Sequence, residues 1–354
     1  MRHSFTPLPS QTPQLLGEVA AAFPKVASVV GAVCGVLGAV LTAADTEGEG
    51  AALVPTVLEQ LGALQEQLPT AACVDAVVTA LERYATLPAV GARREEAPLS
   101  AAVYRAAAPV VTALDADSSL IRTDPALVSH LFLLALRFCE MLPLVAVASR
   151  ALPPLLVAAT HTLEQETLDT EVTRDSLHFL AWLYEVAGRR VGAVAGATLR
   201  SLSHDDAAFV VAGVDALARP AAAVLGGQLL GLVVEGPNPD VADTLADTLL
   251  AVLAAYPDDV RGALEDSVSD LPAILMPSVA AGLSPAAIAA VVPKLMEAAS
   301  AAVASTGPLP TTPFRQVLAD FTAVCRGHAS VDDMLAREFV VDAGFTTARA
   351  AAHR

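Results

Sequence analysis

The sequence is poor in aromatic residues and in lysine. Aromatic side chains make up 4% of its 354 residues, there is one tryptophan, and the only lysines are Lys25 and Lys294. Because 54% of the residues are nevertheless hydrophobic, the core has to be built from small aliphatic side chains, chiefly Ala, Val and Leu. The shortage of lysine also excludes a nucleotide-binding P-loop, whose lysine holds the phosphates.

The chain also lacks the sustained alternation of apolar and polar residues that marks β-strands. Ala and Leu are strong helix formers, so the composition predicts an all-α fold. At about 150 residues per domain the length would allow two domains, but an array of stacked helices forms one continuous body. We expect such an array over residues 25–354, after a poorly defined segment at residues 1–24.

Cysteine is scarce and widely spaced. Cys34, Cys73, Cys139 and Cys325 form no CxxC pair, which argues against a zinc site or a disulfide framework. We interpret them as buried small hydrophobes in a protein from a reducing, intracellular compartment.

Basic residues are few compared with acidic ones. The chain has 21 Lys and Arg against 38 Asp and Glu, a formal net charge of −17. Such a charge repels nucleic acids and anionic lipid surfaces and attracts basic molecules. Basic proteins, or basic segments of proteins, are therefore the expected partners.

The sequence contains long uncharged runs, and its mean hydropathy is +0.55. We therefore considered whether any of these runs could span a membrane. Val26–Ala44 has no aromatic belt and few large aliphatic residues, so a buried helix is favoured over a bilayer span. Leu271–Pro293 is broken by Pro272, Pro277 and Pro285, which predict helix ends and turns. The N-terminus lacks an apolar region close to Met1, so no secretory signal is expected.

Helix starts are marked by a cap residue followed by proline, where the missing N–H is not needed. This pattern occurs at Asp124-Pro125, Asn238-Pro239, Ser284-Pro285 and Thr312-Pro313. Units of a long helix, a turn and a second helix can be read with starts near residues 124, 168, 205 and 239; in the last unit the second helix covers about Asp258–Asp270. The spacing is typical of helical-hairpin repeats such as HEAT and armadillo, so the expected fold is an α-solenoid of HEAT-like repeats.

Catalytic and metal-binding motifs are not found. The histidines show no HExxH spacing, and His204-Asp205-Asp206 is interpreted as a helix cap. Gly31, Gly35 and Gly38 follow no strand, so close helix packing explains them better than phosphate binding. We therefore expect no enzyme activity, no metal and no cofactor.

Several short sequence matches, in order and at matching separations, resemble one family. They are Ala32-Val33-Cys34, then Leu131-Phe132, Ala135, Arg137-Phe138 and Pro143, then Leu168-Asp169 and Phe179-Leu180, then Leu229-Leu230 and Pro239–Leu245, and finally Leu318–Thr322 with Cys325-Arg326. From roughly residue 25 to 326 the chain resembles the C-terminal part of the importin-β (karyopherin-β) nuclear transport receptors. It is most similar to the branch of transportin-SR and importin thirteen.

The resemblance implies a HEAT-repeat superhelix that carries protein cargo between cytoplasm and nucleus under control of the GTPase Ran. In that family the main Ran-binding repeats are N-terminal to the matching region, so we do not expect this chain to bind Ran by itself. The family's arginine-rich, Arg-Ser-reading helix begins at the counterpart of Ala32-Val33-Cys34. Here that helix continues Gly35-Val36-Leu37-Gly38, and no arginine remains to pair with phosphate.

Acidic residues of the 258–270 helix are the candidate cargo-binding groups. They are Asp258, Asp259, Glu265, Asp266 and Asp270, which we expect on the inner face of the solenoid. The plainer interpretation is that they are solvated caps and an exposed helix face. An unrelated HEAT-like scaffold for protein interactions remains the alternative to a transport receptor.

Overall fold

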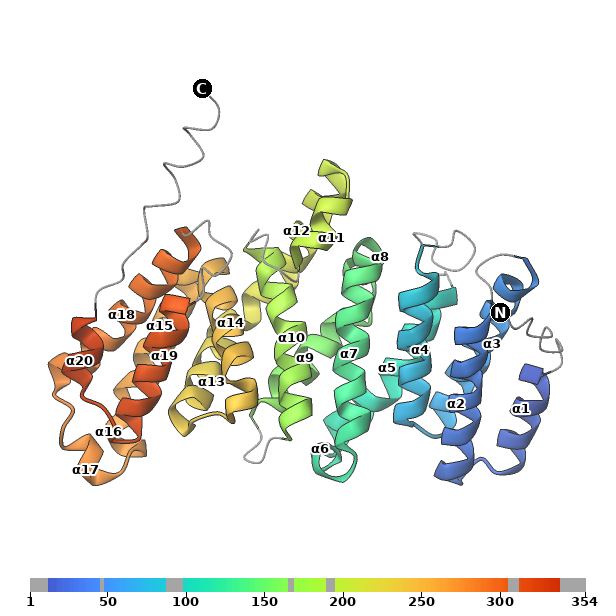
Figure 1. The fold of residues 1–354 in the computed structure, drawn as a ribbon, viewed down its shortest axis with the longest axis horizontal. Helices are drawn as coiled ribbons and strands as arrows, with labels where there is room; N and C mark the ends of the chain where they lie inside the picture. Colours follow the sequence, from blue (N-terminus) through green and yellow to red (C-terminus); the bar gives the residue numbers. More distant parts are fainter. Residues whose placement is uncertain are drawn as a thin grey trace, which may run out of the picture. The chain divides into compact units, whose positions relative to one another are not determined.

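A computed structural model describes residues 12–44, 48–86, 98–164, 169–188, 195–304 and 312–337. Within these ranges every regular element is a helix and there is no strand, so the predicted all-α class is confirmed (Figure 1). The chain divides into two compact units. Unit 1 comprises Met1–Leu180 with Ala193–Val214, and unit 2 comprises Ala181–Gly192 with Asp215–Arg354.

The helices of unit 1 are short to medium in length. They are α1 (Thr12–Ala22), α2 (Ala27–Ala43), α3 (Gly48–Gln67), α4 (Ala71–Tyr84), α5 (Pro98–Ala116), α6 (Leu120–Thr123), α7 (Pro125–Met141), α8 (Pro143–Ala148), α9 (Leu152–Thr162) and α11 (Ala195–Ser201). Two helices, α10 (Thr170–Ala187) and α12 (His204–Ala218), begin in unit 1 and end in unit 2.

Unit 2 contains the remaining helices. They are the 3₁₀ turn η1 (Arg219–Ala221), α13 (Ala222–Glu235), α14 (Pro239–Ala255), α15 (Pro257–Ser269), α16 (Leu271–Ile274), α17 (Pro277–Ala280), α18 (Pro285–Ala304), α19 (Thr312–Cys325) and α20 (Val331–Ala336).

The predicted cap residues lie at helix starts. The carboxylate of Asp124 accepts a hydrogen bond from the amide of Leu127 at 3.1 Å, the side chain of Asn238 accepts from Asp240 at 3.1 Å, and Ser284 Oγ accepts from Ala287 at 3.1 Å. The repeat starts predicted near residues 124, 168, 205 and 239 coincide with the starts of α7, α10, α12 and α14. In the last unit, α14 and α15 are the two predicted helices, separated by Tyr256.

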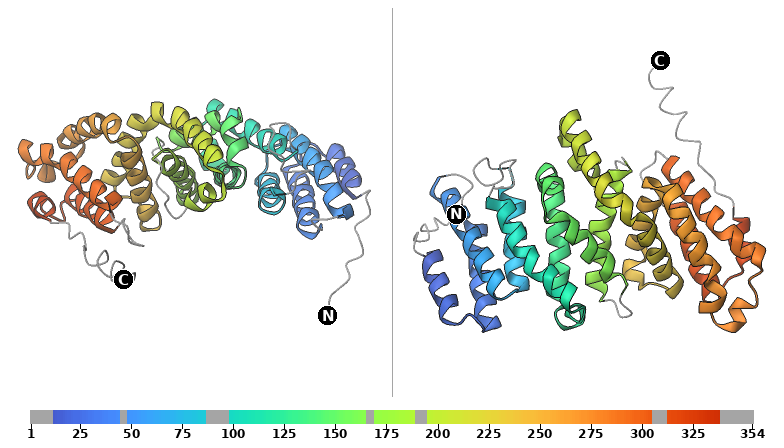
Figure 2. Two further views of the ribbon diagram at one scale, coloured as in Figure 1. Left: turned by 90° about the horizontal axis from the view of Figure 1, so that it is seen from above. Right: turned by 180° about the vertical axis from the view of Figure 1, so that it is seen from behind.

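Unit 1 is built from two rows of helices. In one row α4 packs between α2 and α7, and in the other α5 packs between α3 and α9 (Figures 1 and 2). Each helix therefore buries its apolar face mainly on the helix of the neighbouring hairpin. The largest buried side chains of these helices include Leu37, Leu58, Tyr84 and Phe132.

The glycines of α2 do not all serve close packing. A Cβ atom on Gly38 would lie 3.2 Å from the Cβ of Ala76 on α4, so here the prediction holds. At Gly31 and Gly35 a Cβ would meet nothing within 4 Å. The prediction is wrong at these two positions because they lie away from the α4 seam.

Unit 2 has one row in which α15 packs between α13 and α18, while α19 returns to contact α13, α14 and α18. Arg315 of α19 forms ion pairs with Asp247 and Asp243 of α14. Directly after α13, Gly236 takes the left-handed φ of 80°, and Arg326, in the turn after α19, donates to its carbonyl oxygen at 3.0 Å. A Cβ on Gly236 would overlap the guanidinium of Arg326, so glycine is needed there for two reasons.

The apolar runs are less buried than the sequence suggested. Only one face of α2 is buried, and Val36 on the opposite face is 45% exposed. The prolines of Leu271–Pro293 do start α16, α17 and α18, as predicted, but Pro293 lies inside α18, and Ile274 and Met276 are exposed. Within the described residues, two helical stretches, His204–Glu235 and Pro285–Ala304, are long and apolar enough to cross a membrane, a test of length and composition that core helices of soluble proteins also pass.

Candidate protein-binding surface

Helix α15, which carries the predicted acidic residues, forms for local reasons. Pro257 occupies its first turn, where no N–H is required, and Asp258 and Asp259 follow, where negative charge favours the helix N-terminus. Val260, Leu264 and Val268 recur every four residues and are buried, in a helix that packs against α13 and α18. This one-sided burial fixes which side of α15 is left for solvent.

The five predicted residues all lie on the exposed side of the helix or at its end. Glu265 and Asp258 are seven residues apart, as are Asp266 and Asp259, so they form two adjacent lines along α15, with Asp270 as the C-cap residue. Among the described residues only Asp259 of this group has an ion pair, with Arg219 at 3.5 Å. The other four carboxylates face solvent without a cationic partner in that part of the chain.

Beside these acids, unit 2 contains an apolar groove between α15 and α18. It encloses about 510 Å³, a volume within the usual range of binding pockets. The groove is lined by Glu265, Val268 and Ser269 of α15 and by Pro285, Ile288, Ala289 and Val292 of α18. Of the five predicted acids, the structure therefore brings Glu265 to the groove, and the rest lie along the same helix.

The start of α15 is anchored by a cluster that the sequence analysis missed. The Tyr256 hydroxyl donates to Asp215 at 3.0 Å, Arg219 lies 4.9 Å from the centre of the Tyr256 ring, and the same guanidinium bonds Asp215 at 3.3 Å and Asp259 at 3.5 Å. Tyr184 packs edge-on against Tyr256, with ring centroids 5.9 Å apart. Burial is the main cause that raises the pKa of both tyrosines, so both hydroxyls act as neutral donors.

Only part of this cluster was foreseeable. In the sequence, one helical face is shared by Tyr256 with Val241, Leu245, Leu249 and Val252, and all five are buried. The partner of the Tyr256 hydroxyl, however, comes from α12, 41 residues earlier. The contacts of Arg219 with the Tyr256 ring and with Asp215 hold its guanidinium beside Asp259. Asp259 therefore forms a structural ion pair, in addition to being a candidate for binding partners.

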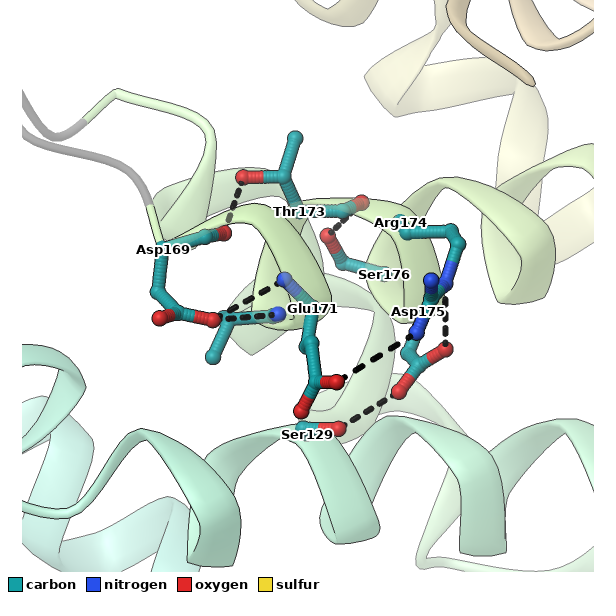
Figure 3. A network of polar contacts seen from close by, with 8 residues as sticks. Ser129, Asp169, Glu171, Thr173, Arg174, Asp175 and Ser176 are labelled. Carbon is teal, nitrogen blue, oxygen red and sulfur yellow. Dashed lines mark hydrogen bonds and ion pairs between the residues drawn. The ribbon is translucent and has the colours of Figure 1, made fainter. Parts of the chain in front are cut away.

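A second polar network, in unit 1, joins α7 and α10 (Figure 3). The Asp169 carboxylate caps α10 by accepting from the amides of Glu171 at 2.9 Å and Val172 at 3.2 Å. Ser129 of α7 donates to Asp175, and Arg174 lies 3.7 Å from the same carboxylate (Figure 3). The polar groups of this network form hydrogen bonds and ion pairs with one another. We therefore interpret the network as a helix cap and an attachment between two helices, and not as a site for a ligand.

The His204-Asp205-Asp206 turn begins α12, as predicted. Ser203 is the residue that caps it, because its hydroxyl accepts from the amide of Asp206 at 3.2 Å, and Asp205 and Asp206 lie in the first turn. Within the described ranges no three His, Cys, Asp or Glu side chains are grouped in a way that could hold a metal ion.

No protein-family model matches the chain, and no curated protein sequence shows a significant match.

Proposed function

We propose that this chain is a protein-binding module, and that α15 and the α15–α18 groove bind an amphipathic segment with apolar side chains on one face and Lys or Arg on the other. The observation that carries the proposal is an apolar groove with Glu265 at its edge, on a helix whose exposed side is acidic. The net charge of −17 acts in the same direction, because it attracts basic partners.

The chemistry of the groove defines the partner. Pro285, Ile288 and Ala289, which are exposed or half-buried, offer apolar contacts to a side chain of the partner, a helix-in-groove mode of recognition. Glu265 and Asp266 are exposed, so each charge pair with a partner contributes only about 0.2–1 kcal/mol and falls with added salt. Affinity therefore comes from the groove, and the preference for basic segments comes from the acids.

At the level of the fold, the proposal is an α-solenoid of HEAT-like hairpins. It is supported by the two rows of helices in unit 1 and by the coincidence of the predicted and observed helix starts. In such arrays each hairpin buries its face on the next.

A narrower proposal is that the chain is the C-terminal segment of an importin- or transportin-like nuclear transport receptor, acting in cytoplasm and nucleus on protein cargo. It rests on the resemblance of the short sequence matches alone. In both proposals the role is binding without catalysis or a cofactor, and Ran and phosphorylated Arg-Ser segments are not partners of this chain by itself.

The test is fluorescence anisotropy with a labelled model peptide that carries Leu on one helical face and Lys on the other. The chain should bind this peptide more weakly as ionic strength rises, and should bind a Leu/Glu version much less. The double variant Glu265→Lys/Asp266→Lys should weaken binding at least tenfold, a change of about 1.4 kcal/mol. Ala289→Phe should do the same by filling the groove, because Ala289 is exposed and its enlargement leaves the core intact.

Matched controls separate the groove from general acidity. Glu18→Lys/Asp115→Lys makes the same charge change on exposed residues of unit 1, and Ala286→Phe enlarges an exposed alanine of α18 outside the groove. Both should bind like the unmodified chain. Equal weakening by the controls, or equal binding of the Leu/Glu peptide, would refute the groove. Ran-GTP and a phosphorylated Arg-Ser peptide as further probes test the narrower proposal, which expects neither to bind.

A further inference from the structure

The fold brings together two cysteines that are far apart in the sequence. Cys34 lies on α2 and Cys73 in the first turn of α4, and both are fully buried. The Cys73 thiol donates to the carbonyl oxygen of Leu61 at 3.1 Å. The hydroxyl of Thr70, the N-cap residue of α4, lies 4.0 Å from Cys34 Sγ and 3.3 Å from the amide of Cys73. Cys34 is therefore held against the N-terminal end of α4.

The two helices run in parallel along a close seam. Cys34 contacts the start of α4, Gly38 meets Ala76 one turn later, and the Tyr84 hydroxyl at the end of α4 donates to the carbonyl oxygen of Ala44 at 3.1 Å. At Gly38 a Cβ would be only 3.2 Å from that of Ala76. Cysteines joined by a disulfide have Cβ atoms about 3.5–4.5 Å apart, and the helices approach at least this closely at Gly38, one turn from Cys34.

The environments of the cysteines differ in reactivity. The neighbouring Cys73 and, less strongly, the Thr70 hydroxyl lower the pKa of Cys34, although burial opposes the change. Cys73 keeps its proton, since the neighbouring Cys34 and burial raise its pKa, and the proton is donated to the Leu61 carbonyl oxygen. By contrast, burial raises the pKa of Cys139, and it raises that of Cys325 to about 11. The thiolate is the reactive form, so Cys34 is the first candidate for oxidation.

We propose that Cys34 and Cys73 are a redox-sensitive pair that a peroxide converts to a disulfide linking α2 to α4. The Cys34 thiolate attacks a peroxide oxygen of hydrogen peroxide, which breaks the O–O bond and gives a sulfenic acid and hydroxide, protonated to water. The Cys73 thiol then attacks the sulfenic sulfur, losing its proton and expelling a second water. The two sulfur atoms lose two electrons in all, and one peroxide is reduced to two waters.

The bond would fix the seam between the first helices of unit 1. The loop that it closes, residues 34–73, contains the whole of α3 (Gly48–Gln67). A covalent link across it restricts the unfolded chain, so the oxidised protein should unfold at a higher temperature than the reduced one.

The test is to treat the folded, reduced chain with hydrogen peroxide and to map its thiols by mass spectrometry without reduction. Trypsin leaves both cysteines in one peptide, because the nearest cleavage sites are Lys25 and Arg83, so a glutamate-specific protease is added to cut between them. We expect a loss of two hydrogens from the intact mass and a linked pair of peptides carrying Cys34 and Cys73. Dithiothreitol should restore the original mass.

Cys139→Ser and Cys325→Ser are the matched controls, since both positions are buried cysteines outside the pair, and both variants should form the link like the unmodified chain. Cys34→Ser and Cys73→Ser should each abolish it. If either of these variants fails to fold, the peptide map of the unmodified chain decides alone. No linked peptide, or a link through Cys139 or Cys325 in equal amount, would overturn the proposal.

Discussion

At the scale of single residues, Glu66 and Arg105 provide the clearest link between geometry and pH. Arg105 of α5 holds Glu66 of α3 through two contacts, Nε–Oε1 at 2.6 Å and Nη2–Oε2 at 3.0 Å. The hydrogen bond from Arg105 lowers the pKa of the Glu66 carboxyl. A lowered pKa means that the pair stabilises the fold when Glu66 is ionised, and only then.

We predict that Glu66→Gln lowers the free energy of unfolding by about 0.5 kcal/mol near pH 7, the scale expected for a pair that is largely open to solvent. The difference should persist above the unfolded-state pKa of about 4.3 and disappear as the pH falls through the lower, folded-state pKa. Urea unfolding at a series of pH values measures it. Glu18→Gln, at an exposed glutamate of α1, is the control and should show no such pH-dependent difference.

Residues whose roles depend on local sequence were predictable, and those that depend on distant partners were not. Asp124, Asn238 and Ser284 cap helices from within three residues, so composition and spacing identify them. The contact between Tyr256 and Asp215 joins residues 41 positions apart, and the contact between Cys34 and Thr70, at the start of α4, joins residues 36 positions apart. Helix periodicity alone gives no register between helices, so it could not predict which of these side chains meet.

At the scale of the element, α2 also has features that its own sequence predicts and features that depend on a distant partner. Its glycines suggested close packing throughout, yet only Gly38 faces α4, while Gly35 is exposed. For α15 the sequence predicted the helix bounds and the exposed acids. It did not predict the groove beside Glu265, because the groove also needs the N-terminal half of α18, which comes after α16 and α17.

The α2 glycines therefore make a matched pair for a stability test. Gly35→Ala should stabilise the protein by about 0.5–1 kcal/mol, because alanine restricts the unfolded chain and fits the helix. Gly38→Ala should lose that gain, since its Cβ would press on Ala76 at 3.2 Å. Thermal unfolding of the two variants checks this. Equal stabilisation by both would show that the α2–α4 seam is looser than described.

At the scale of the whole molecule, the proposed solenoid predicts an extended particle. A single compact domain of this length would have a radius of gyration of about 20 Å, whereas stacked hairpins grow along one axis. Small-angle X-ray scattering of the monomeric chain should give a distinctly larger value. A radius near that of a compact domain would contradict the solenoid, although it would leave the all-α fold unaffected.

The return of α19 to α13 and α14 has a consequence for how the protein is made. Arg315 comes 68 residues after its partner Asp247. Thr322 donates to the carbonyl oxygen of Val233 at 3.2 Å and comes 89 residues after Val233. A ribosome that adds about 5–20 residues per second needs several seconds to cover these distances. During that time the nascent α14 holds Asp243 and Asp247 without their arginine, and the side of α13 and α14 that α19 will cover is open to solvent. Unit 2 can close only after translation has passed Cys325, so this interval is when molecular chaperones have access to its unfinished core.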